Sequence, residues 1–323
     1  MEFIHSVLAQ DETAVAGTVV SYDLPVNPLS HILLTLAATR TAAGDNALPL
    51  IINLINCISK VEVLYKGSAI FSMSGMDAVA CGVYINKFES WGVNFSGIAL
   101  EETSFTIPIP LGRIPYNPRE CFPRSTRGEL ILQITYAAAF TDQTLVRAQI
   151  ETVELPEAAP ERYLRMTTLS TTFAAAGEND IELPIGNPIS DVVLWGGAIS
   201  EGAVFAVTLG YLQILVDNQR HFYSHTNYET THNMAGRMRP APGYWYGHTH
   251  FTPAGVGVAH VIADDHLLQC YTHLPFDIFG DLGYALKTAG KSDVVLRIGV
   301  DAGAASLAVR VIPCEIVPAA GGV

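Results

Sequence analysis

The segment between His221 and His250 holds the residues that are best suited to chemistry. It contains five histidines, namely His221, His225, His232, His248 and His250, together with Tyr223, Tyr228, Tyr244, Trp245 and Tyr246. His248 and His250 are two residues apart, so on a β-strand both side chains would point to one face, as a pair of metal ligands requires. His221 or His225 would then supply a third ligand.

The residues around this His pair argue against a catalytic metal. A His-x-His pair on a β-sandwich invites comparison with cupins, whose first motif places a Glu a few residues after the pair. Here Thr252, Pro253, Ala254 and Gly255 supply no carboxylate, and the matching region of the first half has no His pair. We therefore expect no metal site. We expect the segment to pack against itself or against a neighbouring subunit, because aromatic residues are common at interfaces.

Two further clusters of charged residues could form binding sites, but each also has a simpler interpretation. Asp264 and Asp265 could bind a structural calcium ion at a subunit contact, but adjacent acids more often form a solvated turn. Arg119, Arg124 and Arg127 form a basic patch that could meet an acidic surface of a second copy or lie in an exposed loop. The sequence has no phosphate loop, zinc-protease motif, EF-hand loop or nucleophile elbow. We expect no catalytic residue, no cofactor and no enzymatic activity.

Composition limits the class of protein. The chain has 323 residues, 49% of them hydrophobic and 15% charged, which is ample for two hydrophobic cores. Its net charge of −13 disfavours direct nucleic-acid binding as the main task. The five cysteines have no CxxC spacing, so we expect free thiols in a reducing compartment. We expect neither a signal peptide nor a membrane span, since the apolar run Ala47–Ile58 is too short to cross a bilayer.

An internal repeat indicates the elements that must position these residues. The sequence "YDLPVNPLSHILL" (Tyr22–Leu34) matches "IELPIGNPISDVVL" (Ile181–Leu194) at offsets of 159 and 160. Three more matches follow in the same order: Val61–Ser72 with Leu212–Tyr223 at 151, Arg127–Tyr136 with Lys291–Val300 at 164, and Leu145–Val153 with Ala308–Ile316 at 163. Collinear matches of this kind predict a tandem duplication.

Each repeat has the pattern of short strands joined by turns. Apolar residues alternate with a period of two in the matched segments, and Gly, Pro and Asn mark the turns. The dipeptides Lys66-Gly67 and Asp217-Asn218 suit tight hairpins, because Gly and Asn tolerate positive φ. The prolines at positions 25, 28, 184 and 188 would remove ladder hydrogen bonds, which indicates stiff bends before two buried strands.

The predicted fold is all-β, with two tandem jelly-roll β-sandwiches and few short helices. The best helix signal is Ser74–Phe88, where Ser74 can cap the helix and Asp77 can reach back to the cap backbone. We place the N-terminal jelly roll at residues 1–158 and the C-terminal jelly roll at 159–323. An insertion near residues 223–262 of the second jelly roll carries most of the His/aromatic-rich segment.

In combination these motifs resemble a known family. The segments "YDLPVNPLSHILLTL", "VEVLYKGSAIFSMSGMDAV" and "FPRSTRGELILQITY" resemble the first strand, the following hairpin and helix, and a later strand of double jelly-roll major capsid proteins. These proteins form the shells of tailless icosahedral viruses. The resemblance is to the capsid proteins of the lipid-containing bacteriophages among them. The resemblance covers much of the first half directly and the second half through the internal repeat.

The resemblance implies a structural virion protein that is made in the host cytoplasm. Three copies would form a homotrimeric capsomer with a nearly hexagonal outline, because each copy contributes two similar jelly rolls. It also implies contacts with neighbouring capsomers, with penton and minor capsid or membrane proteins and with a lipid membrane beneath the shell, but none with nucleic acid.

Two other classes of function stay open on the residues alone. A carbohydrate-binding or tail-fibre-like sandwich would use Trp245, between Tyr244 and Tyr246, as a sugar platform. A bicupin-type metalloenzyme would bind a stoichiometric metal and lose activity on His248→Ala.

Overall fold

The computed structural model describes residues 2–40, 48–88, 92–93, 102–141, 143–173, 176–196, 209–228, 230–231, 234, 249–251, 257–259, 268, 270–300 and 307–319. The first half contains β1 (Ile4–Thr13), β2 (Val19–Asp23), β3 (Leu29–Arg40), α1 (Leu48–Ile55), β4 (Ile58–Tyr65), β5 (Ser68–Met73), α2 (Gly75–Asn86), β6 (Gly92–Val93), β7 (Glu102–Pro110), β8 (Leu130–Tyr136) and β9 (Gln143–Glu154). The second half contains β10 (Arg162–Thr167), β11 (Leu169–Phe173), β12 (Gly177–Glu182), β13 (Ile189–Trp195), β14 (Leu209–Val216), β15 (Gln219–Asn227), β16 (Thr249–Phe251), β17 (Gly257–Ala259), β18 (Tyr271–Pro275), β19 (Val294–Val300) and β20 (Leu307–Pro318).

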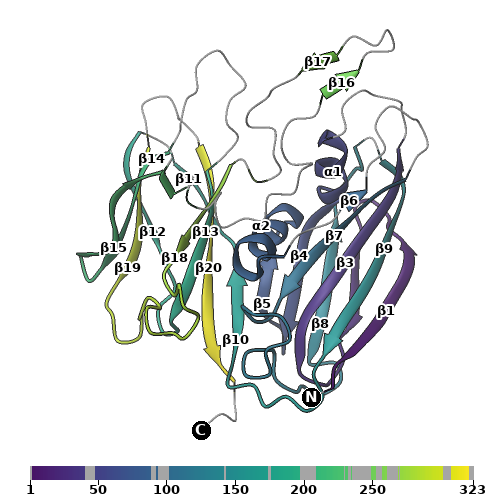
Figure 1. Cartoon of the computed structure of the whole chain (residues 1–323), viewed down its shortest axis with the longest axis horizontal. Helices are drawn as coiled ribbons and strands as arrows, with labels where there is room; N and C mark the ends of the chain where they lie inside the picture. The colour runs from purple at the N-terminus through teal and green to yellow at the C-terminus, as the bar shows by residue number, and fades with distance from the viewer. Residues whose placement is uncertain are drawn as a thin grey trace.

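The strand order is the same in both halves. The first half pairs β7-β3-β9-β1 in one sheet and β5-β4-β8-β2 in the other. The second half pairs β18-β13-β20-β10 and β15-β14-β19-β12. Figure 1 shows the two sandwiches side by side, with β15 at one extreme of the molecule and β1 at the other. The predicted fold class, two tandem jelly rolls with few helices, is therefore confirmed.

Matching hydrogen bonds confirm the repeat at atomic detail. In each half the Asn of the proline-containing bend donates to a Glu of the long last strand, over 2.8 Å from Asn27 to Glu154 and over 3.2 Å from Asn187 to Glu315. Both bends lie between two strands, β2 and β3 or β12 and β13, as predicted for their prolines. The amides of Leu155 and Ile316 both donate to the carbonyl of the proline that follows the Asn.

Two of the predicted offsets between the repeats, for the hairpin and for a later strand, are confirmed, and the offset for the last strand is wrong. Val61 pairs with Ile134, and Leu212 pairs with Ile298, which reproduces the offsets of 151 and 164. The predicted offset of 163 for the last strand is two residues too large, because Leu29 pairs with Glu154 where Ile189 pairs with Glu315. A shift of two residues keeps every side chain on the same face of a strand, so alternation alone cannot detect it.

The turns and the cap follow local chemistry. Lys66, Gly67, Asp217 and Asn218 all have positive φ, between 49° and 81°, as the predicted hairpin turns require. The predicted helix is α2, and the amide of Asp77 donates to the Oγ of its N-cap Ser74 over 3.2 Å. Helix α1 was not predicted and lies inside the apolar run near residue 50. No helix of the described residues is long and apolar enough to cross a membrane.

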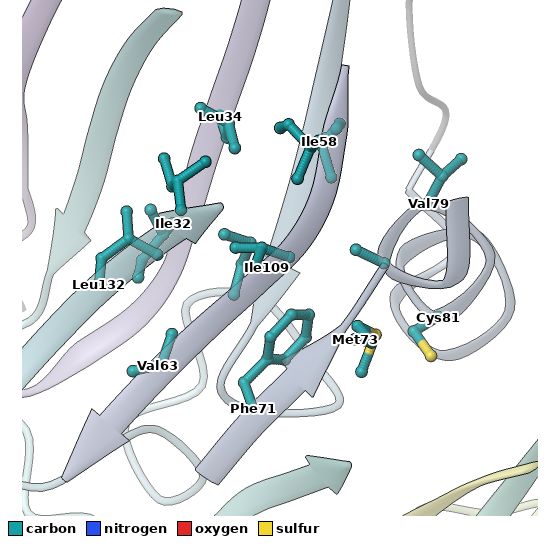
Figure 2. Packing of buried hydrophobic residues seen from close by; sticks show 14 of the residues in the cluster. Ile32, Leu34, Ile58, Val63, Phe71, Met73, Val79, Cys81, Ile109 and Leu132 are labelled. Carbon is teal, nitrogen blue, oxygen red and sulfur yellow. The ribbon is translucent and has the colours of Figure 1, made fainter. Parts of the chain in front are cut away.

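The first core fills the space between the two N-terminal sheets and reaches α2 (Figure 2). Ile32, Leu34 and Ile109 from one sheet meet Val63 and Leu132 from the other, and all five are fully buried. A second core lies between the sheets of the C-terminal half. The predicted boundary at residues 158 and 159 falls between β9 and β10 and stays a prediction.

Candidate functional site: the seam between the jelly rolls

The His-rich segment is only partly described. His221 and His225 lie on β15 and His250 on β16, whereas His232, His248 and Tyr244–Tyr246 lie outside the described residues. The ring of His225 stacks on Tyr211 with 3.7 Å between centroids. Within the part of the chain that the structure describes, no group of three or more His, Cys, Asp or Glu is arranged to hold a metal. The expectation that the chain binds no metal stays a prediction.

The other candidates separate in space. Asp264 and Asp265 lie outside the described residues. Arg124 and Arg127 are exposed, which agrees with the interpretation of the basic patch as an exposed loop. Arg124 donates to the carbonyl of Pro156 over 3.3 Å, and the Nε of Arg119 lies 3.8 Å from Glu161. Whether this patch meets a second copy stays a prediction.

The most developed polar arrangement is the seam where the two jelly rolls meet. Strand β10 continues the N-terminal sheet by pairing in parallel with β5, through Met166 with Phe71 and Thr167 with Ser72. Helix α2 lies between the halves, against the outer face of the sheet β18-β13-β20-β10 (Figure 1). Val193 of that face belongs to the N-terminal core, while its neighbour Val192 belongs to the C-terminal core. This C-terminal sheet is therefore buried on both faces.

An ionic cluster joins the halves at one end of the seam. Arg113, in the loop after β7, donates to Glu120 from Nε and Nη2, each over 2.7 Å, and donates to Asp277 of the second half. Arg162 of β10 also donates to Glu120, over 2.8 Å. Burial acts to raise the pKa of Glu120, but hydrogen bonds and charge from Arg113, together with Arg162, outweigh it and lower the pKa.

A second cluster surrounds the first turn of α2. The carboxylate of Asp77 is fully buried and accepts hydrogen bonds from the Tyr271 hydroxyl at 2.6 Å and from the Arg310 Nε at 3.0 Å. The guanidinium of Arg310 also lies over the ring of Trp195, 3.7 Å from its centroid. Burial, followed by the charge of Asp77, raises the pKa of Tyr271 well above its ordinary value. We had expected the carboxylate of Asp77 to reach back to the cap backbone. It is directed across the seam instead.

A third contact runs between α2 and β18. The hydroxyl of Tyr84 donates to the carbonyl of Tyr271 over 3.3 Å, and the Tyr84 ring stacks on His273 with 5.3 Å between centroids. The Nε2 of His273 lies 2.8 Å from Asp191 of β13. All three contacts hold groups in fixed positions inside protein, so the seam is suited to fixing the mutual orientation of the jelly rolls.

Sequence reasoning singled out Asp77, as a helix-capping residue, and missed the other residues of the seam. Arg113, Glu120 and Asp277 are charged residues in loops, which by residue type alone are expected at the surface. The sequence separates Arg113 from Asp277 by 164 residues, and no local pattern joins them. The internal repeat was the only available signal, because it implies two sandwiches that must meet somewhere.

Comparisons with known proteins agree with this architecture. No protein-family model matches the chain, and none of the curated proteins matches it in sequence.

Three solved structures are similar over nearly their whole lengths. The major capsid protein of Sulfolobus turreted icosahedral virus matches with a TM-score of 0.65 and 12% identity, covering 98% of this chain and 97% of that one. The major capsid protein of bacteriophage PM2 matches with a TM-score of 0.62 and 11% identity, covering 99% of each chain. The capsid of the virus PBCV-1 gives a TM-score of 0.63 at 10% identity, covering 99% of this chain and 95% of that one. The chain therefore has the double jelly-roll fold of these major capsid proteins of icosahedral viruses.

Proposed function

We propose that this protein is the major capsid protein of a tailless icosahedral virus and that it has no enzymatic activity. The observation that carries the proposal is the match of both jelly rolls, in one continuous alignment, to several capsid proteins over 97–99% of this chain and of the first two matched chains. A carbohydrate-binding module would need only one such sandwich. A shell protein uses both, since two similar units per chain give three chains a nearly sixfold outline.

The seam supports this role. A tile of fixed shape needs its two jelly rolls at a constant mutual orientation, because errors in that angle would accumulate over a closed shell. Buried, paired charges specify orientation more strictly than apolar contacts do, since a misaligned charge loses its partners and keeps its desolvation cost. Arg113, whose carbonyl accepts from Asn86 at the end of α2, and Asp77, in the first turn of α2, supply such pairs near both ends of the helix.

The assembly that follows is a homotrimeric capsomer that tiles the shell. Its further partners would be neighbouring capsomers, a penton protein, minor capsid or membrane proteins and a lipid membrane beneath the shell, with the protein located in the virion after synthesis in the host cytoplasm.

The test is the mass of the purified chain in solution, by light scattering coupled to size exclusion. We expect a species of three times the 34.8 kDa chain mass, about 104 kDa, or larger shells. Electron microscopy of that species should show particles with a hexagonal outline. A protein that stays monomeric at high concentration would contradict the proposal, and metal analysis and glycan binding would then test the other two classes.

A further inference from the structure

The contact between the two jelly rolls within one chain indicates how two chains could contact each other. The first jelly roll uses one side to bind the second, and the repeat gives the second jelly roll a corresponding side that faces outward. Resting on the proposed function, we propose that this outward side binds the first jelly roll of a second copy. The contact joins two apolar patches: the loop patch (Ile278, Phe279 and Tyr284) of one copy and the N-terminal patch (Phe3, Ile114 and Tyr116) of the next.

The loops that carry the two patches are equivalent. Loop 111–122 follows β7 and loop 276–286 follows β18, which is the counterpart of β7. Each begins with an amide that donates to a serine carbonyl, from Leu111 to Ser30 and from Phe276 to Ser190. Each ends with a residue that exchanges two backbone hydrogen bonds with the first residue of β3 or β13. Both loops lie at the end of the molecule that carries the chain termini (Figure 1).

Within one chain, loop 111–122 makes the ionic part of the seam. Arg113 and Glu120 bind Asp277 and Arg162, and the carbonyl of Leu111 accepts from the amide of Leu164 over 3.0 Å. Counting from the matched ends of the two loops, Arg113 corresponds to Ile278 and Glu120 to Tyr284. The loop patch therefore occupies the positions that bind across the seam in the first jelly roll.

The N-terminal patch occupies the other side of the corresponding contact. Strand β10 corresponds to β1, because Arg165 pairs with Glu315 where Ile4 pairs with Glu154. Leu164, which meets loop 111–122 across the seam, therefore corresponds to Phe3. By the same count, the segment around Asp277 and Gly280 corresponds to residues 112–115, next to Tyr116.

Side-chain exposure agrees with an apolar contact at both patches. Ile278, Phe279 and Tyr284 are 63%, 71% and 52% exposed, and Phe3, Ile114 and Tyr116 are 55%, 56% and 45% exposed. The aromatic members of each patch lie together, with 5.5 Å between the ring centroids of Phe279 and Tyr284 and 5.3 Å between those of Phe3 and Tyr116. Grouped, exposed, large apolar residues are typical of interaction surfaces.

The contact is heterologous, since a patch on one copy binds a different patch on the next. Heterologous contacts close into rings when the rotation between copies allows it. If the rotation from the second jelly roll of one copy to the first jelly roll of the next equals the rotation between the two jelly rolls of one chain, a ring of three chains presents six jelly rolls in equivalent positions. The ionic seam would be permanent, while the apolar contact would form only on assembly.

The first experiment breaks each patch separately. We expect Phe279→Asp and Ile114→Asp each to convert the trimer to a monomer by light scattering, with an unchanged far-UV circular dichroism spectrum. The matched control is Leu145→Asp, since Leu145 on β9 is also 71% exposed and lies outside both patches. A wild-type protein that forms neither trimers nor larger shells refutes the proposed function. A trimeric wild type with trimeric patch variants refutes only the contact inferred here.

The second experiment tests the pairing of the patches. The double variant Tyr116→Cys with Phe279→Cys, treated with a short bis-maleimide, should give covalent trimers, whereas each single variant should stay uncross-linked. The five native cysteines are buried, which keeps background reaction low. Covalent dimers from a single variant would show that a patch contacts the same patch of another copy. A double variant that is not cross-linked would show that the two patches do not contact each other. Either result overturns the inference.

Discussion

The two jelly rolls share one topology but differ in how their equivalent sheets are covered. In the second jelly roll the outer face of β18-β13-β20-β10 is buried, with Val193 and Ile312 at 0% exposure. In the first jelly roll the equivalent positions are Leu33 and Glu151, which are half-buried, and Glu151 contacts His5 of β1 at 2.6 Å. A strand buried on both faces has a continuous apolar run, and a strand buried on one face alternates. Coverage by α2 thus explains why these equivalent strands differ in sequence.

A charge introduced on the outer face of each sheet tests this difference in coverage and should have the largest effect on stability. Val193→Asp would place an unpaired charge beneath α2 and should lower the free energy of unfolding by about 5 kcal/mol, whereas the equivalent Leu33→Asp should cost about 1 kcal/mol. Urea unfolding of both variants measures the comparison. Equal losses would show that the two outer faces are covered alike in the isolated chain.

The ionic cluster should come next in size. Arg113→Leu leaves Glu120 and Asp277 buried without their main partner, and we expect a loss of about 4 kcal/mol in thermal or urea unfolding. The matched control is Arg297→Leu, which removes a more exposed pair with Asp180 on the outside of the second jelly roll and should cost less than about 1 kcal/mol. A loss as small as that of the control would mean that the seam does not depend on Arg113.

An acid-sensitive site distinguishes the two jelly rolls. Burial, followed by the charge of His5, lowers the pKa of His31 to about 4, while the equivalent position in the second jelly roll is Asp191. The folded state therefore binds fewer protons than the unfolded state between pH 6.5 and 4. Stability from this group is complete above pH 6.5 and is lost as the pH falls toward 4, by about 3 kcal/mol in total.

Urea unfolding of the wild type and of His31→Asn at pH 7 and pH 4.5 measures this effect. Because other groups also titrate in this range, the informative quantity is the difference between the two proteins. The variant should lose less stability on acidification, and parallel losses would contradict the assignment.

The smallest effects should be alike in the two halves. Asn27→Ala and Asn187→Ala each remove one hydrogen bond to a buried Glu, and each should cost about 1 kcal/mol. The shorter contact of Asn27 predicts the slightly larger loss of the two. Melting temperatures of the single and double variants measure this, and a strong inequality would show that the bends have different roles.

Much of the fold was predictable because it depends on local chemistry. Alternating apolar residues, positive-φ turn dipeptides, proline-containing bends and the Ser74 cap act within a few residues of each other, and each was predicted in its place. The offset error in β20 and the missed helix α1 have a common cause. In both cases an apolar pattern was compatible with more than one placement, and only packing against the rest of the chain selects one.

That the chain contains two copies of one strand-rich unit follows from the sequence alone, because a duplication preserves the order and spacing of residues. Which sides of the two units meet follows only from the folded chain. Arg113, Glu120, Asp77 and Arg310 become a seam through contacts between residues far apart in the chain, such as Asp77 with Arg310. Burial turns these ordinary surface residue types into paired charges, and burial is a property of the folded chain as a whole.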